Sequence, residues 1–98
     1  MERYGIYRLQ NAPGLFVLLQ YPGVEQGETL VVAPLVPGAK VTGVDALTPE
    51  IQFAGETYLL GTHLLGAVRL KELGEQVGSA LAYEYDISRA LSRLFFGS

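Results

Sequence analysis

Pro-Gly pairs divide the first part of the sequence into short apolar runs. The pairs are Pro13-Gly14, Pro22-Gly23 and Pro37-Gly38. Proline presets φ for a turn and glycine accepts positive φ, so each pair predicts a turn. The apolar runs have the lengths of strands and cover residues 4–9, 15–21, 29–35, 51–53, 58–60 and 67–70. Short strands with regularly spaced turns are typical of a small antiparallel barrel or sandwich.

Two further signals complete the expected architecture. The stretch IQFAGETYLL predicts a tight hairpin around Ala54-Gly55. In the last third of the chain, from about residue 81 to 95, the apolar residues recur with the period of a helix. Ser79 is the expected N-cap and Gly97 the expected residue after the helix. The stripe that should pack onto the sheet consists of Tyr83, Ile87, Ala90, Leu91 and Leu94.

The predicted helix ends on two adjacent phenylalanines, Phe95 and Phe96. Neighbouring helical residues point about 100° apart, so both rings cannot face one core. Phe96 falls roughly 150° from the centre of the apolar stripe and Phe95 falls at its border. We therefore expect Phe95 to be structural and Phe96 to be displayed. The alternative is a helix that frays at Leu94, with Phe96 folded back onto the sheet. On the displayed side Phe96 is joined by Glu84, Tyr85, Ser88, Arg89 and Ser92.

The composition predicts one folded domain over residues 1–98. Hydrophobic residues make up 49% of the chain and the formal net charge is −3, which excludes disorder and disfavours nucleic acid as a direct partner. The chain has no cysteine, which fits a reducing cytoplasm. No signal peptide or membrane span is expected, because the apolar stretches are interrupted. The small size and high apolar fraction favour a homodimer.

The sequence gives little support for catalysis. His63 is the only histidine, and its apolar, glycine-rich surroundings favour a structural role over that of a general base. One histidine with no cysteine and no grouped carboxylates does not make a metal site. No serine lies in a nucleophile elbow, and no glycine run has the form of a phosphate loop. We therefore expect a protein that is not an enzyme, with no catalytic residues, metal or cofactor.

Four stretches, in their order and spacing, resemble the CcdB-type toxins of bacterial toxin–antitoxin modules. LFVLLQ (15–20) followed by LVVAPL (30–35) resembles the second and third strands of that family. GETYLL (55–60) resembles its hairpin, in which an acidic residue precedes an aromatic one. LGEQVGSA (73–80) and DISRALSRLFFG (86–97) resemble the segment before the last helix and the helix itself. The likeness covers nearly the whole chain.

The resemblance implies a mainly β fold with one C-terminal helix, namely a small SH3-like antiparallel barrel shared with MazF-type toxins. It implies a homodimer that binds the DNA gyrase A subunit and traps the complex of gyrase with cleaved DNA. It also implies a CcdA-type antitoxin as the neutralising partner. Members of the family are not enzymes, so the resemblance agrees with the expectation from the composition.

The resemblance also implies a gyrase-binding surface. The family's final tryptophan, glycine and isoleucine correspond to Phe96, Gly97 and Ser98. Phenylalanine has less area than tryptophan and no indole N–H, and serine loses an apolar contact of ~2 kcal/mol if that contact is fully buried. Both changes weaken the expected contact. The other positions that correspond to the family's target-facing residues are Glu84, Tyr85, Ser88, Arg89 and Ser92 on the helix, with Val24 and Glu25 in a loop.

Two alternatives stay open at this point. The first is a CcdB-fold homologue with weak or lost gyrase activity that acts as an antitoxin-binding interaction domain. The second is a MazF-type ribonuclease on the same barrel. A ribonuclease needs positive surface for the RNA backbone and polar groups for acid–base cleavage. The acidic composition and the single His63 make this reading the less favoured one.

Overall fold

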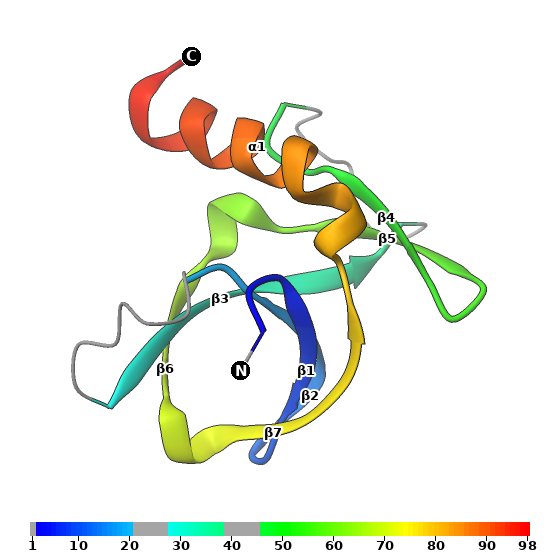
Figure 1. Ribbon diagram of the computed structural model, residues 1–98, viewed down its shortest axis with the longest axis vertical. Coiled ribbons are helices and arrows are strands. Elements are labelled where there is room, and N and C mark those ends of the chain that lie inside the picture. The colour runs from blue at the N-terminus through cyan, green and yellow to red at the C-terminus, as the bar shows by residue number, and fades with distance from the viewer. Residues whose placement is uncertain (1, 21–27, 39–45) are drawn as a thin grey trace.

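The computed structural model describes residues 2–20, 28–38 and 46–98. Antiparallel strands form most of this part, and one α-helix follows them at the C-terminal end (Figure 1), which confirms the predicted fold class. Three short 3-10 turns, η2 (Thr62–Leu64), η3 (Leu70–Glu72) and η4 (Leu81–Tyr83), connect the later elements. The strands are β1 (Gly5–Leu9), β2 (Ala12–Leu18), β3 (Thr29–Pro37), β4 (Glu50–Phe53), β5 (Glu56–Leu60), β6 (Gly66–Arg69) and β7 (Leu73–Ser79), and the helix is α1 (Glu84–Phe96).

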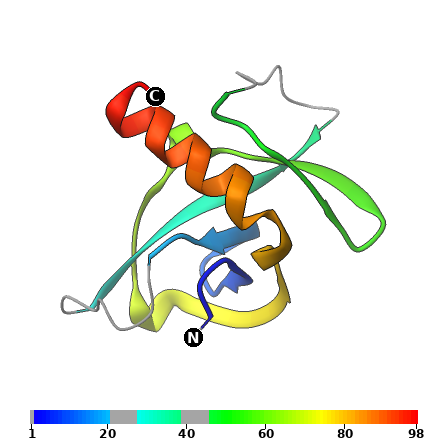
Figure 2. The ribbon, with the colours of Figure 1, turned by 45° about the horizontal axis from the view of Figure 1, so that its top comes forward.

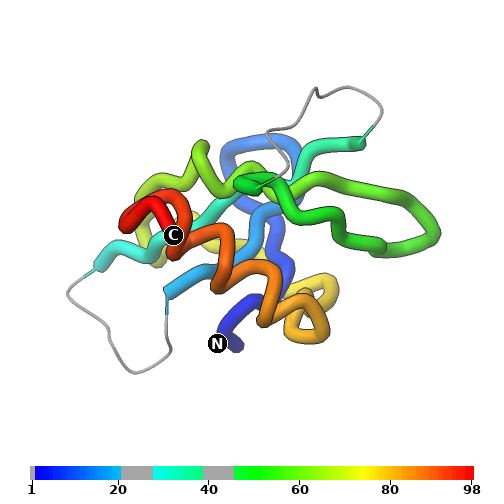
Figure 3. The backbone as a smooth tube through the Cα atoms, turned by 90° about the horizontal axis from the view of Figure 1, so that it is seen from above, coloured from blue at the N-terminus to red at the C-terminus, as the bar shows by residue number. Residues whose placement is uncertain are grey.

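Strand β3 is shared by two parts of the sheet. The strand order is β4-β5-β3-β2-β1-β7, and β6 also pairs with β3. Residues 29–32 of β3 pair with β6, and residues 35–37 pair with β5. Strand β7 follows β6 through η3 and pairs with β1, so the strands curl into a half-barrel (Figure 1). Figure 2 shows α1 lying across this curled sheet. The C-terminal end of α1 is on the opposite side from the tip of the β4–β5 hairpin (Figure 3).

Both faces of the central strands are buried, which explains their nearly continuous apolar runs. Successive side chains of a strand point to opposite faces. In β2, Val17 accordingly joins a cluster on the side of α1, whereas Leu18 joins a cluster on the other side. The first cluster contains Tyr4, Ile6, Leu15, Val17, Leu19, Ala33, Leu35, Ile51, Leu60, Ala80 and Ile87. The second contains Tyr7, Leu18, Leu30 and Val32.

The predicted hairpin is present, and one predicted turn is wrong. Ala54 and Gly55 connect β4 to β5 with φ values of 52° and 81°, as a two-residue hairpin loop requires. Pro13 and Gly14, in contrast, lie inside β2, and the turn before that strand is at residues 10 and 11. Gly14 has a φ of 98°, which a residue without Cβ adopts readily, so the pair is accommodated within the strand.

The other two Pro-Gly pairs have different outcomes. Pro37 is the last residue of β3, so this pair does mark the end of a strand. Pro22-Gly23 lies outside the described residues. Strand β7 was not among the predicted runs, because its sequence LGEQVGS contains two glycines and few apolar residues.

Strand β7 passes close to β1 at Gly74. A Cβ on Gly74 would lie 2.7 Å from the carbonyl oxygen of Arg8. The obstacle is backbone within a paired strand, so we expect Gly74→Ala to lower the free energy of unfolding by about 2 kcal/mol in urea titrations. Gly66→Ala in β6 is the matched control, because a Cβ there would meet nothing within 4 Å. Equal destabilisation by the two variants would contradict this account.

The N-terminal segment is tied to β7 through Glu2. The Ser79 hydroxyl donates to Oε1 of Glu2 at 2.6 Å, and the Gln76 amide donates to Oε2 at 3.4 Å. These hydrogen bonds, that of Ser79 first, lower the pKa of the Glu2 carboxyl below its ordinary value, because they stabilise the charged form. The carboxylate therefore contributes to stability in its ionised state.

The lowered pKa of Glu2 predicts the pH dependence of a variant. A carboxyl whose pKa is lower in the folded state stabilises the fold above its unfolded pKa of about 4.3, and this contribution is lost as the pH falls through the folded value. We expect Glu2→Gln to lower the melting temperature at neutral pH, with a difference from the parent protein that shrinks in acid. Glu75→Gln is the control, because Glu75 is exposed and lies in β7, the strand to which Glu2 is bonded. A difference that does not change with pH would contradict the role of the charge.

Candidate functional site

Helix α1 begins later than predicted and ends where predicted. Ser79 does not cap α1, because residues 81–83 form η4, and the Ser79 hydroxyl accepts the Leu81 N–H at 3.2 Å. Tyr83 precedes α1 and supplies no side-chain cap. At the other end Gly97 is left-handed, with a φ of 75°, and donates its N–H to the carbonyl of Arg93 at 3.0 Å. The helix therefore persists through Phe96, so the fraying alternative is wrong.

Both terminal phenylalanine rings are exposed. Phe96 is 81% exposed, which confirms its predicted display, and Phe95 is 61% exposed, so its predicted structural role is wrong. The cause is the decline of burial along α1. Ile87 and Ala90 are buried, whereas the later stripe residues Leu91 and Leu94 are only half-buried. The sheet thus gives Phe95 little to pack against at the last turn.

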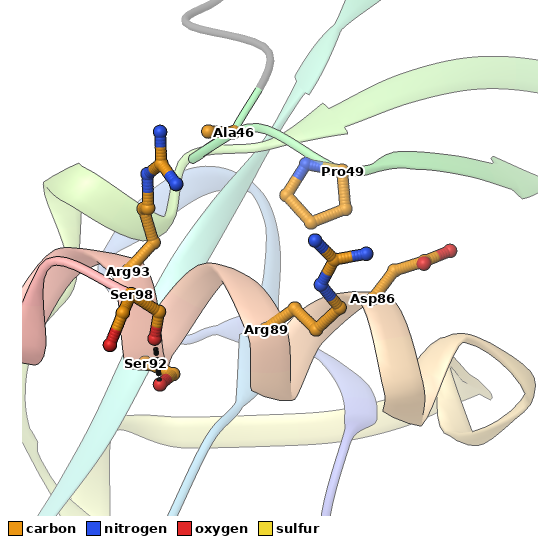
Figure 4. A pocket seen from close by; sticks show the side chains of 7 residues that line it. All are labelled: Ala46, Pro49, Asp86, Arg89, Ser92, Arg93 and Ser98. Carbon is orange, nitrogen blue, oxygen red and sulfur yellow. Dashed lines mark hydrogen bonds between the residues drawn. The ribbon is translucent and has the colours of Figure 1, made fainter.

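The helix residues of the predicted binding surface lie together on α1. Tyr85 is 70% exposed, and the Arg89 guanidinium lies over its ring at 5.7 Å from the centroid. The Ser92 hydroxyl donates to the carbonyl oxygen of Ser98 at 2.6 Å, which folds the last residues back along the helix (Figure 4). We call Tyr85, Arg89, Ser92, Phe96 and Ser98 the helix-end surface. Glu84, Ser88 and Gly97 are also exposed. Val24 and Glu25 lie outside the described residues.

A groove of about 300 Å³ lies between α1 and the segment before β4. Arg89 and Arg93 extend from α1 toward Ala46 and Pro49 on the opposite wall (Figure 4). Asp86, Ser92 and Ser98 complete the lining. Sequence reasoning missed Arg93 and the opposite wall. The spacing of four residues between the two arginines was a signal for their shared face, but the wall depends on tertiary structure.

Two sequence features, the acidic-aromatic pair of the hairpin and the single histidine, lie outside the groove. The Tyr58 hydroxyl donates to Oε2 of Glu56 at 3.0 Å, and this bond to the carboxylate raises the pKa of Tyr58. The acidic residue before the aromatic one thus forms a bond within β5. His63 is exposed in η2 and is not one of the residues that line the groove.

Neither a metal-binding cluster nor a membrane-spanning helix is found among the described residues. Within residues 2–20, 28–38 and 46–98, no three His, Asp or Glu side chains are grouped so that they could hold a metal ion. Across the same residues, no helix has the length and apolar character needed to cross a membrane.

Two of the solved structures that share the fold come from Mycobacterial species. One is an endoribonuclease from a Mycobacterial species, with a TM-score of 0.76 and 16% identity over 94% of this chain and 88% of that chain. The other is an endoribonuclease in complex with its cognate antitoxin, also from a Mycobacterial species, with a TM-score of 0.75 and 14% identity over 94% of this chain and 91% of that chain. A comparison with curated proteins gave no significant match.

The curled sheet with its C-terminal helix therefore has the CcdB/MazF-like fold. The family model described as CcdB protein matches residues 3–97, so the chain belongs to the CcdB family of toxins of toxin–antitoxin systems.

The expectation that the protein is not an enzyme is corrected by the structural neighbours. Both share the fold and are described as endoribonucleases. The expectation depended on the absence of a recognisable motif around His63. Catalytic groups on a barrel can come from separate strands and loops, so a missing short motif does not exclude catalysis.

Proposed function

We propose that this CcdB-family toxin acts by binding the DNA gyrase A subunit through the helix-end surface and trapping the complex of gyrase with cleaved DNA in the cytoplasm. The observation that carries the proposal is the exposure of Phe96. Its side chain is 81% exposed, and α1 continues through Phe96 itself. Exposed aromatic and arginine side chains are the residue types that anchor protein interfaces. Arg89 and Tyr85 supply both types beside Phe96.

The end of the chain is held in place before any partner arrives. Gly97 closes the helix with a hydrogen bond to Arg93, and Ser92 holds Ser98. A preorganised segment loses less conformational entropy on binding than a flexible one. This arrangement supports a direct role for Phe96 and Ser98 in the contact.

An endoribonuclease is the second candidate. It is favoured by the two neighbours, which are endoribonucleases, and by the two guanidinium groups of Arg89 and Arg93 in one groove. Guanidinium groups bind phosphate oxygens and stabilise the charge that develops during phosphodiester cleavage. A third function, an antitoxin-binding domain without toxicity, would leave both activities absent.

An antitoxin completes the proposed system. One structural neighbour is in complex with its cognate antitoxin, and CcdB-family toxins belong to toxin–antitoxin modules. We infer a CcdA-type antitoxin as the partner of this chain.

Induced expression in a gyrase-sensitive host separates these functions. Gyrase poisoning predicts double-strand DNA breaks that disappear in a host with a resistant gyrase A subunit. Ribonuclease activity predicts cleaved transcripts with intact DNA. Growth without either lesion would support the interaction domain. Purified protein mixed separately with gyrase–DNA and with RNA repeats the comparison without cellular stress responses. Transcript cleavage without gyrase binding would overturn the gyrase proposal.

We expect the protein to assemble as a homodimer. The large hydrophobic residues Leu64, Leu70 and Leu81 are 56%, 45% and 50% exposed, and a second copy could cover such side chains. Light scattering at micromolar concentrations should give twice the mass of the 98-residue chain. A monomer over that range would contradict the proposed assembly.

A further inference from the structure

We propose that the groove between α1 and residues 46–49 is a binding site for an acidic peptide segment. Alternate carboxylates of the segment would pair with Arg89 and Arg93. The site extends beyond the helix-end surface, because Arg93, Ala46 and Pro49 are not part of that surface. The inference therefore stands apart from the identity of the toxin's target.

The two guanidinium groups are available for an external anion. Both point across the groove toward Ala46 and Pro49 (Figure 4). Neither forms an ion pair within the described part of the chain, and the Arg89 guanidinium lies over the Tyr85 ring at 5.7 Å from the centroid. Asp86 also lines the groove but is not paired with either arginine. Arginine binds a carboxylate through two parallel hydrogen bonds, so each guanidinium can hold one side chain.

The spacing of the arginines matches that of an extended peptide. Residues four apart on an α-helix are separated by about 6 Å along the axis. Every second side chain of an extended strand points the same way, at a repeat of about 6.7 Å. A peptide lying along α1 can therefore place two carboxylates, two residues apart, against Arg89 and Arg93.

The surroundings favour a short peptide over nucleic acid. The chain carries a formal net charge of −3, and the groove provides only two cations, beside the carboxylate of Asp86. A long polyanion would meet repulsion outside the groove, whereas a peptide segment needs only two carboxylates there. The apolar wall of Ala46 and Pro49, with Phe96 exposed at the end of α1, suits apolar side chains between the acidic ones.

A labelled peptide tests the proposal on the full chain. The probe is fluorescein-labelled Gly-Glu-Leu-Glu-Leu-Glu-Gly, and the control probe has glutamine in place of each glutamate. Fluorescence anisotropy should show binding by the acidic probe only, weakened by added salt. Arg89→Gln and Arg93→Gln should each lower affinity at least about tenfold, as expected for loss of a charged hydrogen-bonded pair.

Lys71→Gln is the matched control variant, because it removes one positive charge from an exposed position in η3 and should leave affinity within about twofold. Circular dichroism establishes that each variant is folded. Absence of binding up to millimolar probe, or an equal loss in all three variants, would overturn the proposal. Tighter binding of a labelled single-stranded RNA with the same dependence on both arginines would overturn it as well and assign the groove to nucleic acid. Because the assay contains no gyrase, its outcome is independent of the proposed target.

Discussion

Phe96→Ala is expected to weaken binding to the gyrase A subunit by about thirtyfold or more, which corresponds to ~2 kcal/mol for an interface hot spot. The melting temperature should change little, because the ring is 81% exposed and exposed substitutions usually alter stability by less than about 0.5 kcal/mol. Affinity and melting temperature must be measured on the same preparations. A variant that binds gyrase as tightly as the parent would remove Phe96 from the proposed interface.

Phe95→Ala is the matched control for this prediction. It removes the same ring from the neighbouring position, which is 61% exposed, so the fold should again be nearly unaffected. A helix presents neighbouring residues in directions about 100° apart, so Phe95 does not share the direction of Phe96. A smaller effect on gyrase binding than that of Phe96→Ala is expected. Conversely, Phe96→Trp combined with Ser98→Ile should strengthen binding, because it increases the apolar area at the contact.

Ile87→Ala is expected to destabilise the protein by about 3 to 4 kcal/mol, the largest effect on folding that we predict. Ile87 is fully buried, and it is the residue of α1 within the cluster that holds the helix against the sheet. Removal of the Ile87 side chain leaves a cavity between α1 and the sheet. Small domains are stable by about 5 to 15 kcal/mol, so the variant should be marginal at physiological temperature.

Urea titration of Ile87→Ala measures this effect directly. Ser88→Ala, one residue further along α1 and exposed, is the control and should change stability by less than about 0.5 kcal/mol. A loss below about 1 kcal/mol for Ile87→Ala would mean that α1 contributes little to the core. Toxicity is expected to fall with the folded fraction, because the helix-end surface exists only when α1 is docked.

The parts of the fold that could be predicted are those with local causes. The Ala54-Gly55 hairpin follows from the backbone preferences of two residues, and the stripe around Ile87 follows from the helical period. Strand β7 could not be found in this way, because its partner β1 lies some seventy positions earlier, with Gly5 paired to Ser79. Its glycines serve a close approach, as at Gly74, rather than a turn.

The candidate site was predictable to a similar degree. The helical period correctly placed Phe96 on the exposed side, but it could not place Phe95, because a wheel contains no information on where the sheet ends. Arg93 was not recognised for the same reason. Its environment is set by Pro49, which comes from another part of the chain.

Because β1 pairs with β7, a newly made chain can complete its sheet only after β7 has been synthesised. Strand β1 is synthesised before β7, so the edge of β1 that pairs with β7 stays open until residues 73–79 have been made. Helix α1, with Phe96, follows later still. Contacts between such distant segments also form slowly, because a long loop must close first. A nascent chain that lacks residues 73–96 therefore cannot display the helix-end surface on a finished fold.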